Sequence, residues 1–287
     1  MTDLVVGSAR DQSPLTDNPY DRWIAPEGDE KALFYRTQTG FLVRFPDEVD
    51  FEIEGVGDRV TAWPVPEAKP DLAENLFNNA ISPILGNHRG GLFLHGSAVE
   101  IGGNAIAFLG MSRSGKTTLA ASFAKAGHPC LTEDVIELVE RDGTYWLQPK
   151  PKVLRLFRDS ADFLLGEQPH WEDEDEKQRV DVADALPFSD EARPLTRLFI
   201  LANNEPDEVL LPHLGAQSAL TELMPHSFIL DVEDKARLSA HFSRLAQLAQ
   251  RIPSHSLDYR REYAELPRVI SAIVHSQTGT APTHETE

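Results

Sequence analysis

Residues 105–118 read AIAFLGMSRSGKTT, and this stretch decides the predicted fold. The apolar run at 105–109 has the character of a buried parallel strand. Residues 110–117 follow it with the spacing G-x-x-x-x-G-K-[ST] of a phosphate-binding loop. A helix is predicted directly after Lys116, and Gly127 stands where a glycine commonly ends a helix. We therefore expect a strand, a loop that binds phosphate groups, and a helix, in that order.

The residue types in this loop suit phosphate groups. Glycines let the backbone curl so that its N–H groups point at phosphate oxygens. Lys116 brings a positive charge to the β- and γ-phosphates, and Thr117 offers its hydroxyl to Mg²⁺. The N-terminus of the following helix adds partial positive charge. The residues predicted to contact a nucleotide are Gly110, Ser112, Arg113, Ser114, Gly115, Lys116, Thr117 and Thr118.

Two adjacent carboxylates, Glu133 and Asp134, follow one helix later, just before a strand predicted from Val135. One carboxylate can bind Mg²⁺ while the other accepts a proton from an attacking hydroxyl. Such a pair is by itself more typical of a solvated turn, but its place after the phosphate loop favours a catalytic role. His95, at the end of a predicted strand before the loop, is a third candidate, although a lone histidine there is more often part of the core.

The sequence before the loop predicts a smaller unit. Residues 1–20 are polar and are predicted to form a loosely held lead-in. Residues 21–90 are predicted to form a β-rich unit with a linking helix. Alternating apolar residues predict a hairpin over 33–45 and a further strand at 50–54. Helical spacing over 72–80 then predicts the linking helix.

Residues 91–276 are predicted to form one α/β domain around the loop, followed by a polar tail at 277–287. The order strand, loop, helix, strand predicts a βαβ unit. A further strand is predicted at 195–201, and helices at 234–251 and 266–275. The first of these helices is predicted to bury one face, made by Leu238, Phe242, Leu245 and Leu248.

The amino-acid composition argues against some classes of binding partner. The chain has 27 Lys and Arg against 46 Asp and Glu, a formal net charge of −19. This charge repels phosphate backbones and anionic lipids, so neither nucleic acid nor a membrane is expected as a partner. The chain has one cysteine, Cys130, which cannot form an internal disulfide, and this favours a cytoplasmic location. We expect Cys130 to be a small buried residue. One cysteine and dispersed histidines offer no zinc-ligand spacing.

Together, the pair His95–Gly96, the phosphate loop, and the run from Gly127–His128 into Glu133–Asp134 resemble the catalytic domain of HPr kinase/phosphorylase. That P-loop serine kinase is related in fold to ATP-type phosphoenolpyruvate carboxykinase. The chain is similar in particular to the shorter HPr-kinase-like proteins of peptide-modification clusters, including lasso-peptide kinases. The resemblance spans about residues 33–275. It implies an α/β fold with an HPr-kinase/PEP-carboxykinase-like P-loop core and a small N-terminal β-rich unit.

The resemblance implies an ATP- and Mg²⁺-dependent kinase that transfers the γ-phosphate to a serine of a ribosomally made precursor peptide. Glu133 would be the base, His95 would orient it, Lys116 would hold the phosphates, and Thr117 and Asp134 would hold Mg²⁺. A homo-oligomer is also implied, since HPr kinases assemble as hexamers. Two alternatives stay open: a kinase for another protein or a small-molecule hydroxyl, and a nucleotide-binding accessory module of a peptide-maturation system.

The chain departs from the HPr kinase pattern in two ways. Glu133 stands where those kinases have aspartate, and no Gly/Arg-rich segment follows Arg158. The missing segment argues against HPr as the substrate and against a phosphorylase activity. Arg155, Lys177 and Arg179 are candidate contacts to phosphate or substrate, although solvated loop charges explain Lys177 and Arg179 equally well. The acidic run at 171–176 is predicted to form a lid or surface loop.

Overall fold

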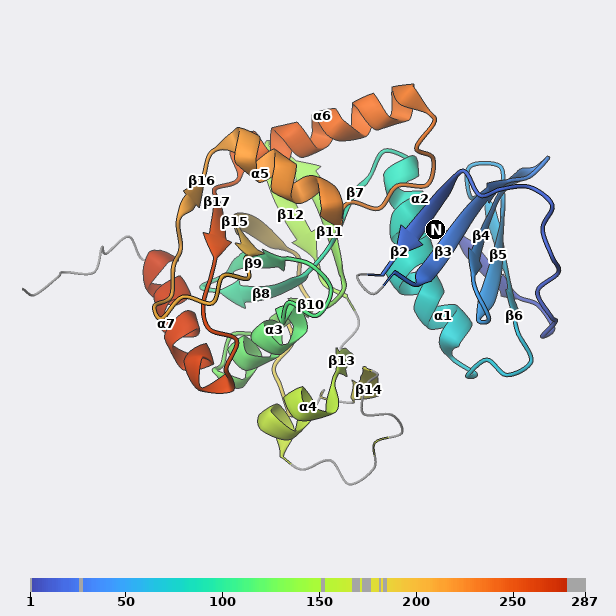
Figure 1. Ribbon diagram of the computed structural model, residues 1–287. Helices are drawn as coiled ribbons and strands as arrows, with labels where there is room; N and C mark the ends of the chain where they lie inside the picture. The colour runs from blue at the N-terminus through green and yellow to red at the C-terminus, as the bar shows by residue number, and fades with distance from the viewer. Residues whose placement is uncertain are drawn as a thin grey trace, which may run out of the picture. The chain divides into compact units, whose positions relative to one another are not determined.

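The computed structural model describes residues 2–25, 28–150, 153–166, 171, 177–180, 182 and 185–277. Its helices and strands are drawn in Figure 1. The chain divides into two compact units. Unit 1 consists of Met1–Phe93 and Phe228–Ser243, and unit 2 of Leu94–Ser227 and Arg244–Glu287. The predicted phosphate loop lies in unit 2.

Unit 1 is built on a sheet that has six strands in the described part of the chain, in the order β1-β6-β5-β4-β3-β2. Neighbouring strands from β2 to β6 pair antiparallel, and β1 pairs parallel to β6. The predicted hairpin and the strand after it are confirmed as β3, β4 and β5. The strands are β1 (Asp3–Val6), β2 (Asp21–Ile24), β3 (Glu30–Arg36), β4 (Gly40–Phe45), β5 (Val49–Glu54) and β6 (Arg59–Pro64).

The predicted lead-in at 1–20 is wrong for Asp3–Val6, which form β1 beside β6. An edge strand is held by backbone hydrogen bonds, and Val5 and Val6 remain 44% and 51% exposed. No alternation of buried and exposed residues therefore marks β1 in the sequence. Its partner lies more than fifty residues further along the chain, and such a pairing cannot be seen in a local pattern.

Helical segments follow the proline-containing loop of unit 1, in agreement with the spacing over 72–80. They are α1 (Leu72–Leu76), a π-helical turn η1 (Phe77–Ile81) and α2 (Ser82–His88). The chain returns to unit 1 at Phe228, whose carbonyl accepts a hydrogen bond of 3.0 Å from Asn87 Nδ2. Unit 1 is therefore made of two separate stretches of sequence. The predicted boundaries instead place the second stretch, residues 228–243, in the α/β domain at 91–276.

A second sheet, with nine strands in the described residues, has the order β10-β8-β9-β15-β12-β11-β7 and continues from β15 to β17 and β16. It lies in unit 2 except for the first two residues of β7. A separate pair is formed by β13 (Leu154–Leu156) and β14 (Gln178–Val180). The strands of the large sheet are β7 (Leu92–His95), β8 (Ser97–Ile101), β9 (Asn104–Leu109), β10 (Cys130–Thr132), β11 (Val135–Arg141), β12 (Thr144–Gln148), β15 (Arg193–Leu201), β16 (His213–Leu214) and β17 (Ser254–Leu257).

The strand that enters the predicted loop is central in this sheet. β9 pairs parallel to β15 and antiparallel to β8. Its apolar residues 105–109 are all buried, as the sequence predicts. β10, the strand after the loop helix, pairs antiparallel to β8 and so runs in the same direction as β9. The βαβ unit is therefore present with β8 inserted between its two strands, and both carboxyl ends meet at one edge of the sheet.

Helices cover the core of unit 2. α3 packs on β8 and β9, and α7 packs on α3. Phe108, Phe123, Phe199 and Val269 are fully buried in one cluster at these contacts. The helices and helical turns are α3 (Lys116–Lys125), α4 (Arg158–Leu165), α5 (Ala216–Leu223), η2 (Met224–His226), α6 (Lys235–Arg251), η3 (Tyr263–Glu265) and α7 (Leu266–Gln277).

The predicted face of α6 needs one correction. Leu245 and Leu248 are buried as expected, but Phe242 is 47% exposed and His241 is 5% exposed. Adjacent helical residues differ by about 100° in direction, so the two cannot share a face. The buried stripe runs through His241 instead of Phe242.

Cys130 is fully buried in β10, as its isolation in the sequence predicts. Burial, and to a smaller extent Glu133, raises the pKa of its thiol to about 12. A thiol with so high a pKa is a poor nucleophile at neutral pH.

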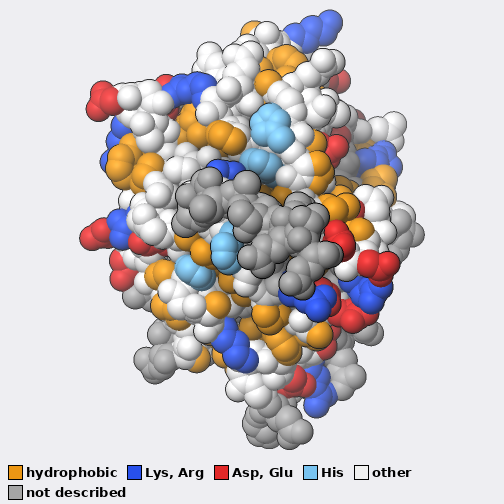
Figure 2. Space-filling model, turned by 90° about the vertical axis from the view of Figure 1, so that its left-hand side faces the viewer, with side chains coloured by type: hydrophobic (Ala, Val, Ile, Leu, Met, Phe, Trp, Pro, Cys, Tyr) orange, Lys and Arg blue, Asp and Glu red, His pale blue; other side chains and the backbone are white. Residues whose placement is uncertain are grey.

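None of the helices in the described ranges is long and apolar enough to cross a membrane. On the face drawn in Figure 2, acidic and basic side chains are intermixed among apolar and uncharged ones. The predicted tail at 277–287 lies outside the described residues, except for Gln277 at the end of α7.

Candidate active site

The loop at 110–116 joins β9 to α3 through backbone conformations that favour glycine. Gly115 has φ +89° and caps the N-terminus of α3, and Arg113 has φ +63°. A Cβ atom on Gly110 would lie 2.7 Å from Ser114 Oγ and 3.0 Å from Leu201 Cβ. The close approach of Ser114 and of Leu201 on β15 therefore disfavours any side chain at 110, which explains the first glycine of the motif.

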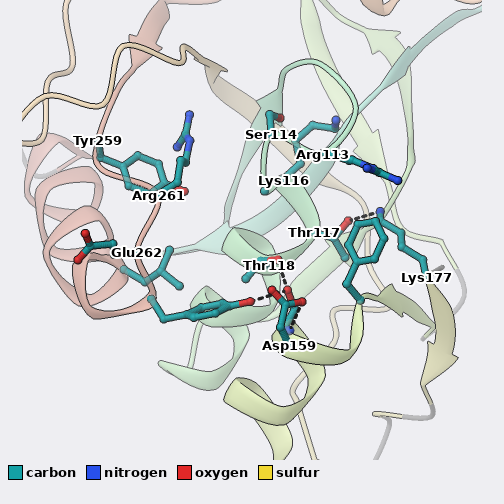
Figure 3. Close-up of a pocket in the computed structure, with 15 residues that line it drawn as sticks. Arg113, Ser114, Lys116, Thr117, Thr118, Asp159, Lys177, Tyr259, Arg261 and Glu262 are labelled. Carbon is teal, nitrogen blue, oxygen red and sulfur yellow. Dashed lines mark hydrogen bonds between the residues drawn. The ribbon is translucent and has the colours of Figure 1, made fainter. Parts of the chain in front are cut away.

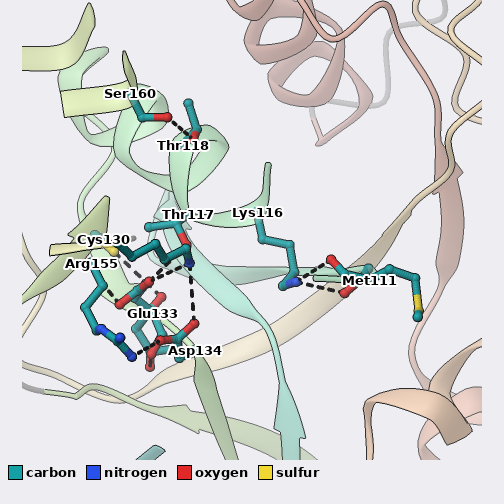
Figure 4. Close-up of polar contacts among 12 residues, drawn as sticks. Met111, Lys116, Thr117, Thr118, Cys130, Glu133, Asp134, Arg155 and Ser160 are labelled. Carbon is teal, nitrogen blue, oxygen red and sulfur yellow. Dashed lines mark hydrogen bonds and ion pairs between the residues drawn. The ribbon is translucent and has the colours of Figure 1, made fainter. Parts of the chain in front are cut away.

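Lys116 is buried inside this loop. Its ammonium donates hydrogen bonds to the carbonyls of Gly110, at 2.8 Å, and Met111, at 2.9 Å (Figure 4). Burial, followed by the nearby Lys177, lowers the pKa of Lys116 to about 8. The lysine thus holds both ends of the loop together, and an incoming phosphate would compete for the same N–H groups.

A pocket of about 430 Å³ opens beside the loop (Figure 3). Its size is that of a site for a small organic molecule. One end is formed by residues 113–118, and the remaining walls come from α4, Lys177 and the segment before α7. The residues of those walls are Phe157, Asp159, Ser160, Lys177, Tyr259, Arg261, Glu262, Tyr263 and Leu266. The pocket therefore extends well beyond the predicted phosphate loop.

A chain of hydroxyl groups runs from the loop to Tyr263 along the wall of the pocket. Thr118 Oγ1 lies 2.9 Å from Ser160 Oγ, which lies 3.2 Å from the hydroxyl of Tyr263. The ring of Tyr263 stacks on Phe163 at a centroid distance of 4.4 Å. Burial raises the pKa of Tyr263 to about 12, so this hydroxyl is protonated at neutral pH.

Arg261 forms another part of the pocket wall. Its guanidinium lies over the ring of Tyr259, 4.0 Å from the centroid, and Nη2 donates to the carbonyl of Ala202. Nε and Nη1 are buried without a hydrogen-bond acceptor among the described residues. The aromatic and arginine residues at 259–263 were not among the predicted contacts. Two tyrosines and two arginines within five residues were the available signal, but only the fold places them beside the loop.

The side chain of Glu133 contacts the first turn of α3. Its Oε1 accepts a hydrogen bond of 2.9 Å from the hydroxyl of Thr117, and its Oε2 accepts one of 3.3 Å from the backbone N–H of Arg155. The side chain is 5% exposed. Burial and, second, the charge of Asp134 raise the pKa of Glu133 to about 7, although Lys177 and Thr117 act in the opposite direction. A carboxylate with this pKa can both take up and release a proton near neutral pH.

Asp134 shares the same edge of the sheet. Its backbone has φ +64°, and its carbonyl accepts a hydrogen bond of 3.1 Å from the N–H of Gly96. Its Oδ2 lies 4.0 Å from Nη1 of Arg155. The structure thus brings both predicted carboxylates to the predicted loop.

Lys177, the residue directly before β14, places its ammonium beside Thr117 and the two carboxylates. Its ammonium lies 3.1 Å from Thr117 Oγ1, 3.5 Å from Glu133 Oε1 and 3.9 Å from Asp134 Oδ1. Arg179, by contrast, is exposed and stands opposite Arg155 in the pairing of β13 with β14. Of the three predicted basic contacts, Lys177 and Arg155 therefore lie at the carboxylates. The predicted lid at 171–176 falls outside the described residues, except for Trp171.

Two histidines lie near Lys116. His95 ends β7, and the bridge between Leu94 and Ser227 places His226 opposite it. Burial first, and then Lys116, lowers the pKa of each histidine to about 4. Both rings are therefore neutral at neutral pH and can act as hydrogen-bonding groups. His226 was not predicted, because only the pairing across 130 residues of sequence reveals it.

The residues present fit a magnesium ion that is bound together with phosphates. The described residues contain no group of three or more His, Cys, Asp or Glu side chains arranged for a metal. Mg²⁺ in phosphate sites, however, is usually held by one or two carboxylates, with phosphate and water completing its shell. Asp134 and the Thr117 hydroxyl match that donor set. The ammonium of Lys177 among these oxygens shows that they attract positive charge.

No family model and no curated protein matches this sequence. Among solved structures, the chain is similar to the HPr(Ser) kinase/phosphatase from Coxiella burnetii, with a TM-score of 0.39 and 10% sequence identity. The similarity covers 65% of this chain and 97% of that chain. By its own helices and strands, the chain has a mixed α/β fold.

Proposed function

We propose that this protein is an ATP- and Mg²⁺-dependent kinase that transfers the γ-phosphate to a serine hydroxyl. The observation that carries the proposal is the buried carboxylate of Glu133, 2.9 Å from the hydroxyl of Thr117 at the end of the phosphate loop. A site that only binds nucleotide has no need of a buried carboxylate with a raised pKa at this position.

The shape of the pocket supports a nucleoside triphosphate as the phosphate donor. The loop and Lys116 suit the β- and γ-phosphates, and Thr118 lies next along the helix. From there the hydroxyls of Ser160 and Tyr263 line the wall of the pocket beyond the loop, where the nucleoside would lie. Pyrophosphate alone would occupy only the loop end of a 430 Å³ pocket.

Each residue has a role in the proposed transfer. The serine oxygen attacks the γ-phosphorus, the bond from that phosphorus to the bridging oxygen breaks, and ADP leaves with the bonding electron pair. The carboxylate of Glu133 receives the hydroxyl proton. Thr117 and Asp134 would hold Mg²⁺, which neutralises negative charge on the β- and γ-phosphates. Lys116 binds the same phosphates, and neutral His95 helps to position the carboxylates.

We propose a ribosomally made precursor peptide as the acceptor. The support is the resemblance of the loop and carboxylate motifs to the HPr-kinase-like enzymes of peptide-modification clusters. Mass spectrometry distinguishes the acceptor classes directly. A serine-containing peptide pool, a protein extract and a set of small hydroxyl compounds are each incubated with the enzyme, ATP and Mg²⁺. The predicted result is a gain of one phosphate on a serine peptide.

The test of the proposed function compares ATP binding by wild type and Lys116→Met. Methionine keeps the buried aliphatic stem but removes the charge that holds phosphate. In calorimetry with Mg²⁺, wild type should bind ATP, and the variant should bind it at least about a hundredfold more weakly. Lys125→Met, on the same helix but outside the pocket, is the matched control. Equal ATP binding by wild type and Lys116→Met would show that the loop is not the active site.

A further inference from the structure

The ammonium of Lys177 lies among the oxygens to which the proposed function assigns the metal. The nearest is the hydroxyl of Thr117, at 3.1 Å, followed by a carboxylate oxygen of Glu133 at 3.5 Å and one of Asp134 at 3.9 Å. The Lys177 side chain is 27% exposed, whereas those of Glu133 and Asp134 are 5% and 12% exposed. A largely desolvated positive charge therefore already stands beside the carboxylates before any ligand binds.

The charges around this point disfavour a free divalent cation. Two cationic side chains lie beside the two carboxylates: Lys177, and Arg155 at 4.0 Å from Asp134. A third, Lys116, interacts electrostatically with both carboxylates from inside the loop. A free Mg²⁺ would add two positive charges to a group that is already balanced or positive. A nucleoside triphosphate brings about four negative charges to the adjacent loop. The same cation becomes favourable once these phosphates are present.

We propose that Lys177 is a positioning residue that occupies the cation position in the nucleotide-free protein, so that Mg²⁺ enters only together with a nucleoside triphosphate. This inference rests on the proposed function, because it takes Thr117 and Asp134 as the metal-binding residues. The arriving phosphates draw the ammonium away from the carboxylates and leave those oxygens to the metal. No covalent bond to Lys177 is made or broken in this exchange; its hydrogen bond to Thr117 is replaced by contacts to phosphate.

The test measures Mn²⁺ binding to the nucleotide-free, full-length protein by electron paramagnetic resonance titration. Lys177→Met removes the ammonium and keeps the stem, so its Mn²⁺ dissociation constant should fall at least about tenfold relative to wild type. Lys150→Met is the matched control, since Lys150 is similarly part-buried at 32% and lies 2.5 Å from the carboxylate of Glu137. The control should leave Mn²⁺ binding unchanged. A merely structural role for Lys177 would not strengthen metal binding.

A second variant shows where the gained metal binds. Adding Asp134→Asn to Lys177→Met should remove the gained Mn²⁺ binding. The inference is overturned if Lys177→Met binds Mn²⁺ no more tightly than wild type, or if the gain survives Asp134→Asn. If wild type still binds ATP in those cases, the proposed function stands without the exchange. If wild type binds no ATP, the proposed function fails, and nucleotide-coupled metal entry fails with it.

Discussion

The surroundings of Glu133 change the acid–base properties of its carboxylate. An exposed glutamate is fully ionised at neutral pH, whereas burial and the adjacent Asp134 raise the pKa of this one to about 7. Hydrogen bonds from Thr117 and the Arg155 backbone hold the carboxylate in one orientation. The side chain is therefore both fixed and able to exchange a proton, as a general base requires.

Glu133→Gln tests this role directly. Glutamine keeps the size and the acceptor oxygen but cannot take up the proton. Calorimetry should show ATP affinity close to that of wild type, while phosphate transfer, followed by mass spectrometry, should slow by roughly 10²–10⁴-fold. The lower end of this range is expected if the nucleophile's proton leaves late in a loose transition state.

The two measurements on Glu133→Gln separate the alternatives. Loss of ATP binding would make Glu133 a structural or metal-binding residue and would transfer the base role to Asp134. Intact binding with intact transfer would rule out Glu133 as the base.

At the scale of elements, the conformation of the predicted phosphate loop depends on how β9, α3 and β15 pack. β15 lies parallel to β9 and brings Leu201 close to the start of the loop. Since β10 runs in the same direction as β9, the carboxylates that follow β10 arrive at the same edge as the loop. Ligands of α/β sheets bind at this edge, beyond the carboxyl ends of the strands.

Gly110→Ala should disturb this arrangement. The added methyl group would lie 2.7 Å from Ser114 Oγ and 3.0 Å from Leu201 Cβ, so the loop must shift. Overpacking of this kind costs about 1–3 kcal/mol. The melting temperature should fall by several degrees, and ATP should bind at least about tenfold more weakly. Both are measured on the same sample, by scanning and titration calorimetry.

Gly215→Ala is the control for this substitution. Gly215 has φ −62°, and nothing lies within 4 Å of a Cβ atom built there. Its melting temperature and ATP affinity should match those of wild type. A Gly110→Ala variant as stable and as tight-binding as this control would contradict the role assigned to the close approach of β15.

At the scale of the whole molecule, unit 1 is completed by a segment that follows much of unit 2 in the sequence. Asp231, in this segment, accepts a hydrogen bond of 2.6 Å from Arg36 Nη2 on β3. The backbone N–H groups of Glu233 and Asp234 donate to the same carboxylate oxygen. Burial by itself would raise the pKa of Asp231, but these hydrogen bonds hold it below its usual value. The ion pair thus links residues that are 195 positions apart.

Asp231→Asn should therefore destabilise the protein in a pH-dependent way. A carboxyl whose folded pKa is depressed stabilises the fold above its unfolded pKa, and this contribution is lost as the pH falls through the folded pKa. Asparagine does not titrate. The variant should be about 1–2 kcal/mol less stable at pH 7, a range reduced because Arg36 is 45% exposed. Below about pH 4 the difference from wild type should shrink.

Urea unfolding of both proteins at pH 7 and pH 3.5 measures this difference. Glu233→Gln is the control, because Glu233 also pairs with Arg36, at 3.1 Å, but is 61% exposed. It should change the stability by less than about 0.5 kcal/mol. A loss of stability for Asp231→Asn that is the same at both pH values would show that charge pairing is not its cause.

Features that depend on neighbours in the chain could be predicted from the sequence. The strand at 105–109, the loop after it and the helix from Lys116 follow from apolar runs, glycine positions and helical spacing, each within a few residues. The hairpin of β3 and β4 is also a local pattern. Glu133 and Asp134 could be selected as site candidates because they stand one strand–helix–strand step after the loop.

Features that depend on residues far apart in the sequence are visible only once the chain is folded. These include β1 beside β6, β8 inserted between β9 and β10, and the return of the chain to unit 1 at Phe228. The same is true of the site, where Lys177, His226 and the wall at 259–263 reach the loop through pairings of β14, β7 and β17. The physical reason is that the spacing of apolar residues along a helix or strand shows which of its faces is apolar. The same spacing does not show which distant helix or strand packs against that face.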